Sequence, residues 1–287
     1  MEDYKWYSGK YDRAFKEVML KESNRDLLTM LLEHILKIKI NNITILNVEH
    51  LRSNIHVKNQ RLDLYLETNI GKINVEVNST YKSFTSYRNF SYIADIYSHD
   101  ILSGKEYDLD KEYIQINLSY GLNINEIPID IYKVLNRNGK SFIDNFTIYN
   151  INMEYYTNLI KNNDKNKINN DIILVMLGQE RDNLSKLSKT NKVVSKYMNE
   201  LDEVNKNPEF REYMSYELEQ EILRNTERKI GYKDGIKEGI EQGIEQGIEQ
   251  RNKEIVKNLL NTNMSISDIS NIVNLPEDEI KKIRDSK

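Results

Sequence analysis

The chain has 287 residues, 30% of them charged, with a formal net charge of −4 at pH 7 and no cysteine. The lack of cysteine excludes disulfides and thiolate-bound metals and favours a cytoplasmic location. The net charge does not indicate a nucleic-acid binder, although a local basic patch could still bind DNA.

Membrane insertion and secretion are not expected. No apolar run approaches the roughly 20 residues that cross a bilayer. The first residues lack a basic region followed by an apolar core, so we expect no signal peptide.

The N-terminal half predicts a mixed helix–strand core. Apolar residues recur at helical spacing from Asp12 to Lys37, and Ser23 with Asp26 forms a candidate cap for a second helix. The resulting order (helix, three strands, helix, strand) predicts an α/β fold. The later elements are a strand at 43–50, a hairpin at 61–80, a helix at 86–104, and strands at 112–121 and 145–153.

The remainder of the chain reads as helical, with polar breaks at 161–171 and 205–210. Its tail predicts three short helices, with a capping box at Ser265 and Asp268 and Pro276 at a first helical position. We therefore divide the chain into a core at 1–156, a helical extension at 157–230, a glycine-periodic linker at 231–250 and a small helix-turn-helix-like module at 251–287.

The hairpin at 61–80 places acids on one face. Leucines alternate with Asp63 and Glu67 on its first strand, and Ile and Val alternate with Glu76 and Asn78 on its second. Both apolar sets must face the core, so Asp63 lies opposite either Glu76 or Asn78. In both registers the side chains of Asp63 and Glu76 share a face, with their Cβ atoms roughly 5 to 8 Å apart. Such a pair suits a hard divalent cation, and the alternative is a solvated hairpin face.

Other segments accompany this hairpin in a characteristic order and spacing. They are "DRAFK" at 12–16, "LLTMLLEHIL" at 27–36, Asp63, Glu76, "YRNFSYIADIYSHDILSGKEY" at 87–107, "IQINL" at 114–118, the glycine-periodic segment and the ending "SISDISNIVNLPEDEIKKI". Together they give the sequence a resemblance, over nearly the whole chain, to the PD-(D/E)XK nuclease superfamily, and within it to the recombination-promoting nuclease (Rpn) and transposase family.

The resemblance implies a DNA-cutting enzyme that uses a divalent metal, usually Mg²⁺, with Mn²⁺ or Ca²⁺ as other candidates. Asp63 and Glu76 would be metal ligands, with the backbone carbonyl of Val77 as a third. The family's next signature side chain is Lys or Gln, whereas this chain has Asn78, whose amide is one methylene shorter.

Asn78 is assigned a catalytic role with Asp63, Glu76 and Asp12, and the alternative is a polar residue at a strand end. The shorter side chain is expected to weaken or abolish activity, because about 1 Å of misplacement can cost about 100-fold in rate. A relocated lysine, Lys16 or Lys82, could compensate for the shorter Asn78. Asp12 either adds an acid near the metal or caps the first helix.

Other residues are assigned to DNA contact. Arg88 and Tyr92 share a helical stripe with His99, and Lys82 lies just upstream. We assign contacts to DNA to Arg88, Tyr92, Lys82 and Lys16, with Arg88 on backbone phosphates. His99 is interpreted as a surface or interface residue and Glu67 as solvated.

The glycine-periodic segment leaves two interpretations open. Glycine every four residues disfavours a helix by about 1 kcal/mol per position, yet isoleucine repeats in step with it. Close approach of helices in a homodimer or higher homo-oligomer is one interpretation, and a tolerated polar spacer is the other. The last helix begins with the acidic "PEDE", which favours protein contact over DNA recognition.

The predicted function is a divalent-metal-dependent DNA endonuclease that acts in recombination or defence. The alternative is a catalytically weakened DNA- or protein-binding module whose C-terminal helices mediate oligomerisation.

Overall fold

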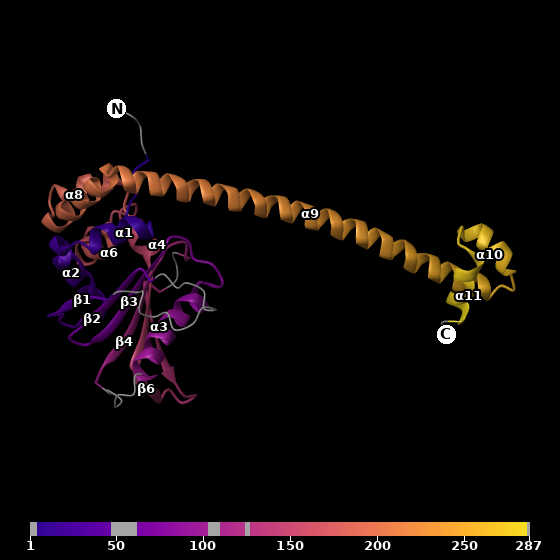
Figure 1. The fold of residues 1–287 in the computed structure, drawn as a ribbon, viewed down its shortest axis with the longest axis horizontal. Coiled ribbons are helices and arrows are strands. Elements are labelled where there is room, and N and C mark those ends of the chain that lie inside the picture. The colour runs from indigo at the N-terminus through magenta and orange to yellow at the C-terminus, as the bar shows by residue number, and fades with distance from the viewer. Residues whose placement is uncertain (1–4, 47–61, 103–109, 124–126, 286–287) are drawn as a thin grey trace. The chain divides into compact units, whose positions relative to one another are not determined.

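A computed structural model describes residues 5–46, 62–102, 110–123 and 127–285. Within them, the first part of the chain forms helices around a sheet (Figure 1). The elements are α1 (Asp12–Met19), η1 (Glu22–Asn24), α2 (Arg25–Leu36), β1 (Ile43–Ile45), β2 (Leu64–Thr68), β3 (Gly71–Asn78), α3 (Thr85–Leu102), β4 (Glu112–Ser119), β5 (Ile129–Leu135) and β6 (Ser141–Asn152).

The described strands form one sheet in the order β1-β2-β3-β4-β6-β5. The pairs β1/β2, β2/β3 and β5/β6 are antiparallel, whereas β3/β4 and β4/β6 are parallel. Parallel neighbours need a crossover, and α3 supplies it between β3 and β4. The α/β class and the predicted order of elements are therefore confirmed. The sequence analysis did not predict β5, and it placed the start of β6 at residue 145 instead of Ser141. Residues 47–50 of the first predicted strand, and Gly104 at the predicted end of the helix at 86–104, lie outside the described residues.

Alternation along the strands gives the sheet two different faces. One face carries the apolar set, in which Leu64, Leu66, Ile73, Val75 and Ile116 are fully or almost fully buried. The other face carries the polar side chains and is covered by α3, whose Ile93 and Ile96 pack with Tyr65 and Tyr113 in one apolar cluster. Polar groups on that face are thereby held between a sheet and a helix.

The β2–β3 hairpin turns tightly before Gly71, the first residue of β3. Gly71 has φ +144°, and a Cβ there would lie 2.0 Å from the carbonyl oxygen of Glu112. Glu112 N–H also donates to the carbonyl of Ile70, at 2.9 Å. Only glycine allows β4 to approach the turn this closely, so the contact with Glu112 sets where the second strand of the hairpin begins.

Helices α1 and α2 form largely as predicted, but the cap does not. Asn24, not Ser23, is the residue before α2, and Ser23 lies inside η1. The amide of Asn24 donates to the carbonyl of Val18 at 3.0 Å and makes no cap hydrogen bond. Asp26 accepts from Lys196 at 2.5 Å, so this acid serves a contact with α8 (Lys192–Lys206).

The helices that follow the sheet belong to the same compact unit, Met1–Arg211. The predicted break at 205–210 is confirmed, since α8 ends at Lys206 and a new helix begins at Pro208, where a missing N–H costs nothing. The predicted break at 161–171 contains a short helix. The remaining helices of this unit are α4 (Met153–Asn158), α5 (Lys165–Asn170), α6 (Ile172–Leu177) and α7 (Arg181–Ser188).

The second unit, Glu212–Lys287, contains most of α9 (Pro208–Leu260), with α10 (Ile266–Val273) and α11 (Glu277–Asp285). The predicted capping pair is present, because Asp268 N–H donates to Ser265 Oγ at 3.1 Å. The first of the three helices predicted for the tail is the end of α9. No helix in the described ranges is both long and apolar enough to span a membrane.

Candidate active site

Asp63 and Glu76 meet on the polar face of the β2–β3 hairpin. Leu64 pairs with Val75 and Tyr65 with Asn74, so Asp63, directly before β2, lies opposite Glu76. The backbone N–H of Asp63 donates to Glu76 Oε1 at 3.1 Å. Of the two registers that the sequence allowed, the structure has the one with the acids face to face.

Both carboxylates are removed from water. The side chain of Asp63 is 7% exposed, and Glu76 as a residue is 3% exposed. Buried carboxylates need partners, and Asp63 has two: Lys16 Nζ lies 2.6 Å from its Oδ1, and Val77 N–H donates to its Oδ2 at 2.7 Å. Lys16 reaches the acid pair from α1, so a cation from a separate helix lies at the hairpin.

The electrostatics of the pair follow from burial. Burial raises the pKa of the Asp63 carboxyl, and the Lys16 ammonium only partly opposes this. Burial, and secondly the negative charge of Asp63, raise the pKa of Glu76 to about 8. Two like charges in a site without water resist joint ionisation, so a nearby cation would stabilise the ionised form of both carboxyls.

Asn78 is held by the protein rather than presented to solvent. Its Oδ1 accepts from Arg88 at 2.6 Å and from Asn89 at 3.4 Å, and its Nδ2 donates to Ser119 Oγ at 3.2 Å. It is only 3% exposed. The amide therefore fixes the guanidinium of Arg88, whose positive charge opposes the rise in the pKa of Glu76.

The other predicted site residues lie at varying distances from the acids. Asp12 is the first residue of α1 and is exposed, and its charge adds to the raised pKa of Asp63. Its Oδ1 accepts from Arg13 N–H, and the residue before α1, Tyr11, makes no side-chain cap. Tyr92 is half-buried on α3, and the charge of Glu76 contributes to its raised pKa after burial itself.

Lys82 is exposed in the turn before α3. Its backbone N–H donates to Thr85 Oγ1 at 3.0 Å, and its carbonyl accepts from Thr85 N–H at 2.9 Å. Within the described ranges its side chain makes no hydrogen bond or ion pair. Of the two lysines proposed as a substitute for the signature lysine, the structure thus brings Lys16 to the acids, whereas Lys82 stays in the turn.

A chain of buried amides extends from Glu76 across the sheet, and the sequence interpretation missed it. Asn74 Nδ2 donates to Glu76 Oε1 at 3.1 Å and to Gln115 Oε1 at 2.9 Å. Gln115 in turn donates to Asn117 Oδ1 at 2.8 Å, and Asn89 donates to the same oxygen at 2.9 Å. The available signal was polar residues at alternate positions of the apolar strand "IQINLS".

The donor set is compatible with a hard cation. No group of three or more His, Cys, Asp or Glu side chains that could hold a metal exists within the described ranges. Mg²⁺, however, often binds through one or two carboxylates, waters and substrate phosphates. Asp63 and Glu76 meet that requirement, and the buried Oδ1 of the adjacent Asn74, which has no donor within the described ranges, adds an unmatched acceptor.

The sheet, its crossover helix and the buried Asp–Glu pair on the hairpin define an α/β protein with a PD-(D/E)XK core. The family model described as "PD-(D/E)XK nuclease family transposase" matches residues 9–232, and the chain belongs to this family. Rpn proteins are members of it, so the resemblance seen in the sequence is confirmed. Searches of the curated proteins and of the solved structures returned no match. Membership suggests a phosphodiesterase with DNA as substrate, in a family that typically uses divalent metals.

Proposed function

We propose that the protein is a divalent-metal-dependent DNA endonuclease that hydrolyses phosphodiester bonds during recombination or defence. The observation that carries the proposal is the face-to-face placement of two buried acids, Asp63 and Glu76, with Lys16 Nζ 2.6 Å from Asp63. An acid pair that lacked a function would be better placed in water, because burying it is costly.

Each residue has a role in this proposal. Asp63 and Glu76 would hold Mg²⁺, Mn²⁺ or Ca²⁺, with the carbonyl of Val77 as third ligand. When bound, the cation supplies Lewis-acid charge for water activation and for the phosphate. Lys16 brings its ammonium to the same carboxylate and takes the part of the signature lysine, while Asp12 adds negative charge near the pair.

The remaining assigned residues would bind the DNA backbone. Arg88 presents a guanidinium that Asn78 orients, which suits a phosphate oxygen. Asn78 is then a positioning residue and does not touch the reacting atoms. Tyr92 lies on the same helix one turn further along, and exposed Lys82 adds charge at the start of that helix.

Plasmid nicking in Mg²⁺ tests the proposal. Wild-type protein should relax supercoiled DNA, and Asp63→Ala should not. Glu67→Ala is a matched control, because Glu67 is an acid on the same hairpin face with a side chain that is 47% exposed. No cleavage by the wild type, or equal cleavage by wild type and Asp63→Ala, would contradict the proposal.

A second function has its own supporting observation. The ammonium of Lys16 already neutralises Asp63, and the amide of Asn78 is engaged by three neighbours. Both features also suit a catalytically weakened module that binds DNA or protein, with α9 to α11 forming a homo-oligomer. Metal-independent DNA binding without nicking by the wild type is the outcome that selects this function.

A further inference from the structure

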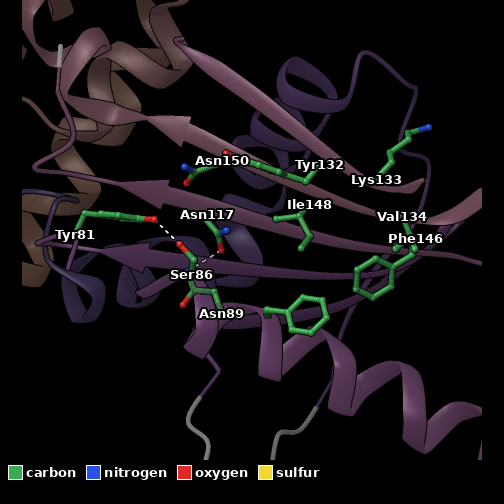
Figure 2. Close-up of a pocket in the computed structure, with 11 residues that line it drawn as sticks. Tyr81, Ser86, Asn89, Asn117, Tyr132, Lys133, Val134, Phe146, Ile148 and Asn150 are labelled. Carbon is green, nitrogen blue, oxygen red and sulfur yellow. Dashed lines mark hydrogen bonds between the residues drawn. The ribbon is translucent and has the colours of Figure 1, made fainter. Parts of the chain in front are cut away.

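A cavity of about 360 Å³ lies between the start of α3 and the β5–β6 hairpin. Figure 2 shows amide and hydroxyl groups at one end, and mostly apolar side chains together with Lys133 at the other. The volume is within the range of small-molecule sites, about 300–1,000 Å³. The lining residues are Tyr81, Ser86, Asn89, Phe90, Asn117, Tyr132, Lys133, Val134, Phe146, Ile148 and Asn150.

Aromatic rings make up much of the apolar end. Phe90 is 52% exposed and Tyr132 is 51% exposed. The ring of Phe90 meets that of Phe146, which also lines the cavity, edge-on with centroids 6.2 Å apart, and this contact supports its orientation. Half-exposed rings on two separate elements, α3 and β5, offer flat apolar surface to a planar ligand.

The polar end offers hydrogen-bond donors. Asn117 Oδ1 is occupied by Gln115 and Asn89, and Asn150 Oδ1 accepts from Ser119 Oγ at 3.1 Å. The Nδ2 groups of Asn117 and Asn150 have no acceptor within the described ranges. The two residues are direct partners on β4 and β6, so two amide donors lie one strand spacing apart, about 5 Å.

Strand pairing and one side chain relate the cavity to the candidate active site. Asn117 pairs with Glu76 across β3 and β4, which places it one strand from the acid pair. Asn89 donates both to Asn117 in the cavity wall and to Asn78. A nucleotide next to a phosphate held at Asp63 and Glu76 would therefore lie within reach of the cavity, because neighbouring strands are about 5 Å apart.

We propose that this cavity is a nucleobase subsite, which receives an unstacked base of the DNA strand and stacks it against Phe90. The inference rests on the proposed function for its choice of DNA as ligand. A base provides what the cavity lacks: a flat π-face for the exposed rings and edge acceptors for the two free amide groups. An unstacked base is available in single strands or by flipping from a duplex, so the subsite favours DNA with unpaired bases.

Binding measured without cleavage tests the subsite independently of the enzyme activity. Fluorescence anisotropy in EDTA would compare a labelled thymidine single strand with a strand of equal length built from abasic nucleotides. Both strands carry the same phosphates, so the ratio of their dissociation constants isolates the bases. Stacking of one base corresponds to about 5- to 150-fold in affinity, and Phe90→Ala should reduce the ratio by a factor in that range.

Two variants provide controls for Phe90→Ala. Phe90→Tyr retains a ring and should retain the ratio. Phe142→Ala is the same chemical change at a residue that is 80% exposed and outside the cavity lining, and it should also leave the ratio unchanged. Thermal melts show whether each variant is folded.

The outcomes separate the subsite from the nuclease. Nicking activity with equal binding of thymidine and abasic strands would overturn the subsite and leave the proposed function standing. A ratio that depends on Phe90, without nicking, would support the subsite while refuting the endonuclease. A fall in the ratio for Phe142→Ala equal to that for Phe90→Ala would also overturn the subsite.

Discussion

Replacing Glu76 by glutamine should make the metal-free protein more stable, and increasingly so as the pH rises. The carboxyl of Glu76 is buried beside Asp63, and its pKa is raised from 4.5 to about 8. The folded protein therefore holds this proton more tightly than the unfolded chain, so stability falls as the pH rises through that interval. An uncharged glutamine does not release a proton, and the variant escapes the loss.

The size of the effect follows from the same interval. Each pH unit between the two pKa values removes about 1.4 kcal/mol of unfolding free energy from the wild type. The difference between Glu76→Gln and wild type should then be near zero at about pH 4, about 3 kcal/mol at about pH 7 and about 4 kcal/mol at about pH 8, where half of the folded molecules have lost the proton. The amide oxygen can still accept from Asp63 N–H and Asn74 Nδ2, so the existing hydrogen bonds at Oε1 are retained.

Urea denaturation in EDTA across this pH range measures the difference directly. Glu67→Gln is the control, since that exposed acid on the same hairpin should change stability by less than about 0.5 kcal/mol. A stability difference for Glu76→Gln that is constant with pH, or that shrinks as the pH rises, would refute the reasoning.

Two further predictions concern the same site. Millimolar Mg²⁺ should raise the melting temperature of the wild type through preferential binding to the folded state, and should leave Asp63→Asn unchanged in a thermal melt; equal rises in both would place the cation elsewhere. Lys16→Met should cost about 3 kcal/mol of stability near neutral pH, because it leaves a buried carboxylate unpaired, and less in acid, where Asp63 is protonated. Lys21→Met, which removes a more exposed ion pair to Glu200 at 2.7 Å, should cost under about 1 kcal/mol in the same urea titration; equal costs would show that burial does not matter.

The sequence was sufficient to predict which hairpin residues share a face, but not which residues of the two strands pair. Alternation alone requires Asp63 and Glu76 to share a face. It leaves two pairings open, because both bury the same leucines and valines. The choice between them depends on where the turn closes, and this depends on the approach of β4 to Gly71, a tertiary contact between distant segments.

Strand β5, the position of Lys16 and the start of α2 were not predicted from the sequence, each for a physical reason. Strand β5 leaves Ile131, Tyr132 and Val134 at least one third exposed, so its place in the sheet does not follow from the need to bury an apolar face. The position of Lys16 against Asp63 depends on how α1 packs on the sheet, and residue spacing carries no information on that. The cap at Ser23 failed because η1 moves the start of α2 beyond it.

The glycine at the hairpin turn has a consequence at a distance. Gly71 contributes no chemical group to the acid pair, yet the pairing that it fixes is counted from it along β3 as far as Glu76. The position of Gly71 at the turn therefore sets which residue of β3 lies opposite Asp63. An insertion of one residue after Gly71 would shift every later position of β3 by one, exchange its faces and move Glu76 into the apolar layer. Constraint on this site therefore extends to a residue that never meets the substrate.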